Sequence, residues 1–175
     1  MKEYNSVSEP FLAELRAAVG EANVFTSPEK LEQYKTDEEY DPRRFRVPEA
    51  VVRPANAEEI AAVVKLCNKY NVPLTVRSGG TSLADGAIAV CGGIVLLMER
   101  LNKIIEMNTE AMYVIAEAGV RTIDIQKLAN DAGFLYAGDP CSAESCQIGG
   151  NLATNAGGSK AVRYGVTRNQ VYSLE

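Results

Sequence analysis

Apolar residues recur at helical spacing near the start of the chain and predict a helix over residues 10–19. Gly20 follows this helix directly and is typical of a helix end. A second helix is predicted to begin at Pro28, because Ser27 is a good capping residue and proline fits a first helical turn. The apolar pattern of this second helix fades near Asp37.

A strand, a helix and another strand are predicted next. Residues 37–46 are charged and rich in turn formers, so they are interpreted as an exposed loop. Short apolar runs predict strands over residues 50–52 and 74–76. Between them lies an amphipathic helix that is capped by Asn56 and ended by Asn71. This succession is a β-α-β unit, which predicts that the two strands are parallel and neighbouring.

The pattern changes in the second half of the chain. Strands are predicted over residues 94–98, 104–107 and 113–116, and the turn-like residues between the last two favour an antiparallel meander. Another helix is predicted to begin at Thr122 and to end at Gly133. The fold class is therefore α+β: a β-α-β unit plus a mixed or antiparallel sheet with flanking helices.

The amino-acid composition excludes several classes of protein for this chain. The 175 residues are 46% hydrophobic and 23% charged, as expected for a globular chain. The formal net charge of −5 argues against a general nucleic-acid binder. No apolar run approaches the roughly 20 residues of a transmembrane helix, and no signal peptide is evident, so a cytoplasmic location is expected. The four cysteines form no CxxC pair, so reduced thiols and no metal site are expected.

The chain contains no histidine. A Ser-His or Cys-His nucleophile pair and a histidine general base are therefore excluded within these residues. No catalytic residue is assigned for this reason. A cofactor, or a segment outside these residues, is expected to do most of any chemistry.

A first glycine-rich stretch follows the predicted strand at 74–76 and reads PLTVRSGGTSL, residues 73–83. Consecutive glycines after a strand present backbone N–H groups without obstructing side chains, and such a row binds anions, above all phosphate. Hydroxyl groups and the charge of Arg77 could add to the site. The alternative is an ordinary connecting loop. Neither a GxGxxG motif nor a P-loop is present.

A second glycine-rich stretch reads DPCSAESCQIGGNLATNAGGSKAVRYG, residues 139–165. Its two Gly-Gly pairs, at 149–150 and 157–158, are joined by mostly small residues. The near-exclusion of large side chains suits close backbone approach to a flat ligand. The alternative is a tightly packed turn against a helix.

Together the two stretches resemble the FAD-binding domain of the FAD-linked oxidases, the vanillyl-alcohol-oxidase/p-cresol-methylhydroxylase (PCMH) superfamily. The branch of D-lactate dehydrogenase, the glycolate oxidase large subunit and D-2-hydroxyglutarate dehydrogenase is the most similar. The runs AVVRPANAEEIAAVVKLCNKYNVP and GGIVLLMERLNKI also fit. The resemblance covers roughly residues 30–175, and the predicted helices before it assign residues 1–45 to an N-terminal helical segment. The resemblance implies a PCMH-type FAD-binding domain over residues 46–175 that is incomplete at its C-terminus.

The resemblance further implies which residues bind the cofactor. The first stretch would hold the FAD pyrophosphate through backbone amides, with Ser78 in place of a usual glycine. The second would lie along the flavin, ribityl and adenine parts. FAD is expected to be non-covalent, because the chain lacks histidine and Cys146 is not at the spacing of a cysteinyl link. The implied cofactor-binding residues are Arg77, Ser78, Gly79, Gly80, Thr81, Ser82, Ala118, Gly119, Pro140, Cys146, Ile148, Gly149, Gly150, Asn155 and Gly157.

The function implied is the FAD-binding portion of a flavin-dependent 2-hydroxyacid dehydrogenase or oxidase of D-lactate or glycolate type. Such an oxidoreductase transfers a hydride from a CH–OH group to FAD. Relatives are more than twice this long, so a cap domain that binds the small-molecule 2-hydroxy acid is expected outside these residues, and the chain alone is expected to be inactive. The electron acceptor and a homodimeric assembly are left open. The alternatives are a non-catalytic flavin- or nucleotide-binding module that works with a separate subunit, and a chain whose incomplete site binds nothing.

Overall fold

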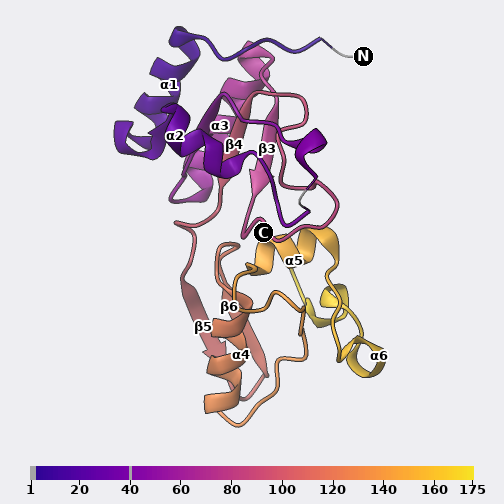
Figure 1. Cartoon of the computed structure of the whole chain (residues 1–175). Helices are drawn as coiled ribbons and strands as arrows, with labels where there is room; N and C mark the ends of the chain where they lie inside the picture. Colours follow the sequence, from indigo (N-terminus) through magenta and orange to yellow (C-terminus); the bar gives the residue numbers. More distant parts are fainter. Residues whose placement is uncertain (1–2, 40) are drawn as a thin grey trace. The chain divides into compact units, whose positions relative to one another are not determined.

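The computed structural model of the chain describes residues 3–39 and 41–175 (Figure 1). Its contacts divide the chain into two compact units, Met1–Arg100 and Leu101–Glu175. Each unit has its own sheet, and each carries one of the two glycine-rich stretches. The two stretches are therefore built by different local structures.

A four-stranded sheet forms the centre of the first unit, in the order β1-β2-β4-β3. Strand β4 runs parallel to both β2 and β3, while β1 pairs with β2 in the antiparallel sense. In this register Val95 of β4 lies opposite both Val51 and Thr75. The strands are β1 (Val24–Phe25), β2 (Ala50–Val52), β3 (Leu74–Arg77) and β4 (Ile94–Leu97).

This topology corrects two expectations. Strands β2 and β3 are parallel, but the prediction that they are neighbours is wrong, because β4 lies between them. The prediction that β4 belongs to an antiparallel meander is also wrong. All four residues of β4 are buried, as a central parallel strand that is covered on both faces requires. An apolar run of this length predicts a strand but does not identify its partners.

Helices cover this sheet, and the longest two are α1 (Glu9–Val19) and α3 (Ala57–Tyr70). The Asn56 side chain accepts a hydrogen bond from the Glu59 amide at 2.8 Å, and left-handed Asn71 ends α3, as the sequence predicts. A short helix α2 (Pro28–Leu31) continues as a 3₁₀ turn over Glu32–Tyr34. Further 3₁₀ turns span Glu21–Asn23 and Pro42–Arg44. Helices α1 and α3 share a core with β2 and β4 that includes Phe11, Leu15, Val52, Val63, Cys67, Ile94 and Leu96.

The second unit begins with an antiparallel hairpin, β5 (Ile104–Asn108) and β6 (Tyr113–Ala116). Helix α4 (Thr122–Asp131) follows, and Gly133 with φ +81° lies just beyond its end. The second glycine-rich stretch contains helices α5 (Ile148–Thr154) and α6 (Ala161–Tyr164), and a 3₁₀ turn at Thr167–Gln170 follows it. Among the described residues, no helix combines the length and apolarity needed to cross a membrane.

Candidate functional site

The first glycine loop, residues 78–82, begins where β3 ends at Arg77. None of the described residues accepts a hydrogen bond from the backbone amides of this loop. Gly79 is exposed, and the other four residues are partly exposed. Five consecutive donors that the described protein does not use form the kind of backbone row that binds a phosphate group.

Arg77 packs against this loop from within the first unit. Its Nη1 donates to the carbonyl oxygens of Thr36 at 2.7 Å and Ala87 at 3.3 Å. Gly80 has φ +70°, a conformation that favours glycine, and a Cβ atom there would lie 2.3 Å from Arg77 Nη2, so the guanidinium would have to shift. Burial lowers the pKa of the Arg77 guanidinium, and the charge of Asp37 opposes that effect. The cofactor contact predicted for Arg77 stays a prediction, since its hydrogen bonds go to backbone carbonyls.

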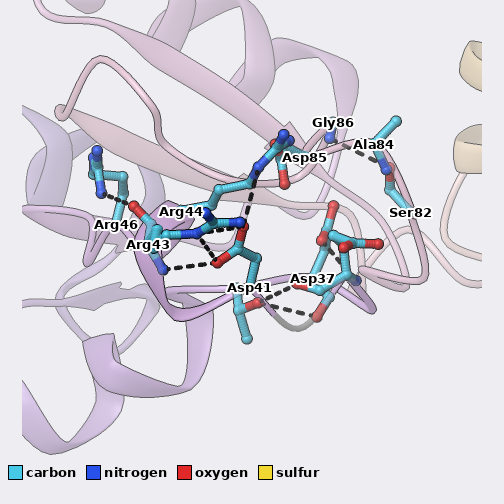
Figure 2. A network of polar contacts seen from close by, with 11 residues as sticks. Asp37, Asp41, Arg43, Arg44, Arg46, Ser82, Ala84, Asp85 and Gly86 are labelled. Carbon is cyan, nitrogen blue, oxygen red and sulfur yellow. Dashed lines mark hydrogen bonds and ion pairs between the residues drawn. The ribbon is translucent and has the colours of Figure 1, made fainter.

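Ser82 stabilises the far side of the loop (Figure 2). Its Oγ accepts hydrogen bonds from the amides of Ala84 at 3.1 Å and Gly86 at 3.3 Å. These bonds leave the hydroxyl hydrogen available to a ligand. Ser78 is not among the residues with positive φ, so its replacement of a glycine carries no left-handed backbone strain.

The sequence predicts an exposed loop over residues 37–46; Glu38 is exposed as predicted, but for Asp37 and Asp41 the prediction is wrong. Asp37 is 8% exposed, and the Asp41 side chain is 18% exposed. Asp41 forms ion pairs with Arg43 and Arg44, and these bonds hold the pKa of its carboxyl below the usual range. The local pattern does not reveal this arrangement, because Arg44 also pairs with Asp85, 41 positions away.

The second glycine-rich stretch is anchored to the residues before α4 by backbone hydrogen bonds. The Ile148 amide donates to the Val120 carbonyl at 2.8 Å, and the Gly149 amide donates to the Ala118 carbonyl, also at 2.8 Å. Ala118 and Gly119, both predicted cofactor residues, therefore lie beside the first turn of α5. The structure thus brings Ala118, Gly119, Ile148, Gly149 and Gly150 together within the second unit.

Buried side chains reinforce this anchor. Asn151 Nδ2 donates to Thr122 Oγ1 at 2.5 Å, and Cys146 Sγ lies 3.2 Å from the same oxygen. All three residues are at most 5% exposed. The Cys146 thiol therefore hydrogen-bonds within the unit, and its predicted contact with the cofactor stays a prediction. The sequence predicts Thr122 only as a helix start, because no local pattern marks a partner 29 positions away.

Two glycines of this stretch are required by close chain packing. A Cβ on Gly158 would lie 1.6 Å from the Asp139 carbonyl oxygen, and one on Gly149 would lie 2.8 Å from Ala118 Cβ. At Gly157 the same atom would make an ordinary contact of 3.4 Å with Val166 Cγ1. The tightly packed turn, which the sequence leaves open as an alternative, therefore describes Gly149 and Gly158.

A pocket of about 440 Å³ lies beside this stretch in the second unit. Asp139 borders it, and its carboxylate accepts hydrogen bonds from Ser159 at 2.9 Å and Gln126 at 3.3 Å and pairs with Lys160 at 3.1 Å. The bonds from Lys160 and Ser159 lower the pKa of Asp139. Predicted site residue Pro140 also lines this pocket. Elsewhere in the stretch, Asn155 accepts a hydrogen bond from the Arg168 amide at 3.0 Å through Oδ1.

The cysteines are separate from one another. All four are free; Cys67 and Cys146 are buried, whereas Cys91 and Cys141 are exposed. Within residues 3–39 and 41–175, no group of three or more cysteine, aspartate or glutamate side chains is arranged to hold a metal ion.

Comparison with known proteins identifies the family. Residues 48–175 match the family described as "FAD binding domain". The chain is 37% identical over 134 residues to the glycolate oxidase subunit GlcD of Bacillus subtilis, covering 77% of this chain and 28% of that protein. It is 37% identical over 162 residues to the D-2-hydroxyglutarate dehydrogenase of Stutzerimonas stutzeri, covering 93% and 34%.

The fold agrees with this match. The structure of p-cresol methylhydroxylase with substrate bound superposes with a TM-score of 0.71 at 25% identity, covering 86% of this chain and 30% of that one. The chain spans about a third of the length of the curated relatives that it matches. It belongs to the FAD-binding domain family, with the PCMH-type fold and FAD as its cofactor.

Proposed function

We propose that this chain binds FAD non-covalently as the FAD-binding portion of a flavin-dependent 2-hydroxyacid dehydrogenase or oxidase. The observation that carries the proposal is the run of five backbone amides at residues 78–82 with no acceptor among the described residues. This run lies inside the segment that matches the FAD binding domain. A pyrophosphate carries the negative charge and the oxygen acceptors that such a row of donors binds.

The residues present suit FAD in chemical terms. The amides of Gly79, Gly80 and Thr81 would hold phosphate oxygens, and the Ser82 hydroxyl hydrogen would add a donor. In the second unit, the exposed Gly157 and the first turn of α5 would offer backbone and small side chains to the rest of the cofactor. When bound, FAD supplies the hydride-accepting chemistry, and this chain's residues bind and orient it.

The substrate class is proposed from the relatives. GlcD is named for glycolate and the Stutzerimonas enzyme for D-2-hydroxyglutarate, and both compounds are 2-hydroxy acids. Oxidation of such an acid requires a base for the hydroxyl proton and a positive group for the carboxylate. We assign neither role to a residue of this chain.

The experiment is a titration of the purified chain with FAD, followed by flavin fluorescence. FMN serves as the comparison ligand, because it carries the flavin and one phosphate but no pyrophosphate. The proposal expects tighter binding of FAD than of FMN. It also expects the yellow colour to remain in the supernatant after acid precipitation. Equal affinity for the two flavins would contradict the pyrophosphate assignment, and colour in the pellet would contradict non-covalent binding.

A second assay addresses the chemistry. The FAD-loaded chain is mixed with D-lactate, glycolate or D-2-hydroxyglutarate and a dye that accepts electrons. We expect no saturable turnover from these 175 residues. The chain contains no histidine to act as the base, and the groups that bind the substrate are expected in a cap domain outside these residues. Turnover that a variant in the first glycine loop abolishes would show that these residues do carry the catalytic groups.

A further inference from the structure

Three contacts connect residues 36–44 to the segment that includes the first glycine loop. Arg77 Nη1 donates to the Thr36 carbonyl at 2.7 Å. The Glu38 amide donates to the Ser82 carbonyl at 3.1 Å. Arg44 Nη1 forms an ion pair with Asp85 Oδ2, which Figure 2 shows together with Asp41. We call the described residues of this segment, 36–39 and 41–44, the strap, because their contacts reach both ends of the loop.

The backbone positions of both Arg44 and Asp85 are restrained by their local conformation. On the strap, Asp41 caps the 3₁₀ turn by accepting from the Arg43 amide at 3.1 Å, and its Oδ2 lies 3.7 Å from Arg44 Nε. Asp85 has φ +57°, a left-handed conformation that aspartate and asparagine tolerate better than most residues. Its side chain is 18% exposed, and its Oδ1 is buried without a hydrogen-bond partner in the described part of the chain.

The negative charge of Asp85 would affect the binding of an anion to the first glycine loop. Asp85 is a carboxylate three residues beyond the loop that we propose to bind a pyrophosphate. With Arg44 beside it, its negative charge is compensated and its side chain is fixed. Without Arg44, a poorly hydrated carboxylate would be left close in sequence to the anion-binding amides, and its position would no longer be restrained.

We propose that the strap holds the first glycine loop in its binding conformation and that Arg44 acts through Asp85 as a positioning residue for FAD. This inference rests on the proposed function for its effect on affinity. The restraint on the loop is a property of the protein without FAD. The two parts can therefore be measured separately.

The experiment uses the full chain and four variants: Arg44→Gln, Arg44→Lys, Asp85→Asn, and a double variant that combines Arg44→Gln with Asp85→Asn. Asparagine keeps the left-handed preference at position 85, so this change removes charge without adding backbone strain. Lys69→Gln is the matched control, because Lys69 forms an ion pair with Glu14 at 2.7 Å in the same unit, between helices α3 and α1. Each protein is titrated with FAD, and amide hydrogen exchange is recorded without FAD.

We expect Arg44→Gln to weaken FAD binding about three- to fivefold, the scale of a partly exposed ion pair. We also expect faster exchange in peptides that cover residues 36–44 and 78–87. Arg44→Lys keeps the charge and should stay close to wild type, as should Lys69→Gln. In the Asp85→Asn background, Arg44→Gln should cause no further loss, because the partner through which it acts has already lost its charge.

An equal loss from Arg44→Gln in both backgrounds would overturn the positioning role, since Arg44 would then act without Asp85. Unchanged exchange of residues 78–87 in Arg44→Gln would overturn the restraint itself. If the wild-type chain binds no FAD, the proposed function fails, and the exchange data alone decide whether the strap restrains the loop.

Discussion

The two glycine-rich stretches look alike in sequence but are held by different forces. In the first unit, side chains hold the residues on either side of the loop: Arg77, which precedes it, packs against Gly80, and Arg44 pairs with Asp85, three residues beyond it. Five loop amides remain without an acceptor among the described residues. In the second unit, the stretch pairs through its backbone with the residues before α4, and Gly149 and Gly158 fit where a Cβ atom would collide.

This difference teaches that a glycine pair has two separate uses. In the first loop, Gly79 leaves backbone N–H groups accessible, so a substitution at this position should affect the proposed FAD binding more than folding. In the second stretch, glycine allows two parts of the chain to approach closely, so substitutions at the tightest positions should affect folding first. Variants in the two stretches should therefore separate binding from folding.

The largest effect on stability is expected for Gly158→Ala. The new Cβ would lie 1.6 Å from the Asp139 carbonyl oxygen, and backbone cannot move aside as a flexible side chain can. We expect the free energy of unfolding to fall by about 3 kcal/mol or more, measured by urea denaturation. Gly157→Ala is the control, because its Cβ would make an ordinary contact at 3.4 Å. Similar losses for both variants would contradict the packing argument.

The largest effect on binding is expected for Gly79→Asp. A carboxylate in the loop would repel the pyrophosphate and obstruct the amides, so FAD affinity should fall by about a hundredfold or more while the helical circular dichroism is retained. Gly79→Asn adds nearly the same bulk without the charge and should lose less. Unchanged FAD affinity in Gly79→Asp, measured by fluorescence titration, would remove this loop from the site.

A smaller loss of stability is expected for Thr122→Val. The change would remove the acceptor of Asn151 Nδ2 and leave a buried amide unpaired, which costs about 1–3 kcal/mol. Thr154→Val is the control, since Thr154 bonds to the Gly150 carbonyl from an exposed position. Equal unfolding free energies for Thr122→Val and wild type would show that the buried hydrogen bond does not anchor the second stretch.

The smallest effects concern the thiols, of which each unit has one buried and one exposed. At about pH 8, a disulfide reagent should react rapidly with Cys91 and Cys141 and slowly with Cys67 and Cys146. Rapid reaction of all four thiols in the native protein would contradict the burial of Cys67 and Cys146.

The buried Cys67 thiol also predicts a dependence on pH. Burial raises its pKa from 9.0 to about 11. The folded state therefore favours the protonated thiol, and its stabilising contribution is complete below pH 9 and is lost as the pH rises toward 11. The unfolding free energy should fall less steeply over this range in Cys67→Ala than in wild type. Parallel pH curves for the two proteins would contradict the raised pKa.

Local pattern predicts much of this molecule. The cap at Asn56, the left-handed end of α3 at Asn71 and the helix at Thr122 each depend on neighbours within a few residues, and the structure confirms them. The placement of β4 between β2 and β3 depends on pairing across the sheet, which hydrophobic spacing does not encode. The sequence pattern misses helix α5 because glycine and asparagine are poor helix formers, and its tertiary anchor to residues 118–122 overrides that preference.

Some features of the candidate site could likewise be predicted from the local sequence, and others could not. The glycine loop after β3 follows from the sequence, because adjacent glycines after an apolar run are typical of a loop, whereas the contact of its amides with FAD stays a prediction. The contacts that Arg77 and Cys146 make inside the protein could not be read from the sequence, since their partners lie at least 10 positions away. The many charged residues of the strap favour a solvated surface. The ion pair of Arg44 could not be predicted from this local pattern, because its partner Asp85 is 41 positions away.

The most direct test of the central claim is a two-dimensional ¹H–¹⁵N NMR titration of the 175-residue chain with FAD. If the first glycine loop holds the pyrophosphate, the amide resonances of residues 79–82 shift with FAD concentration. These resonances should shift less with FMN, and the amide of Glu14 on α1 should stay in place. Saturable FAD binding without any shift at residues 78–82 would contradict the account.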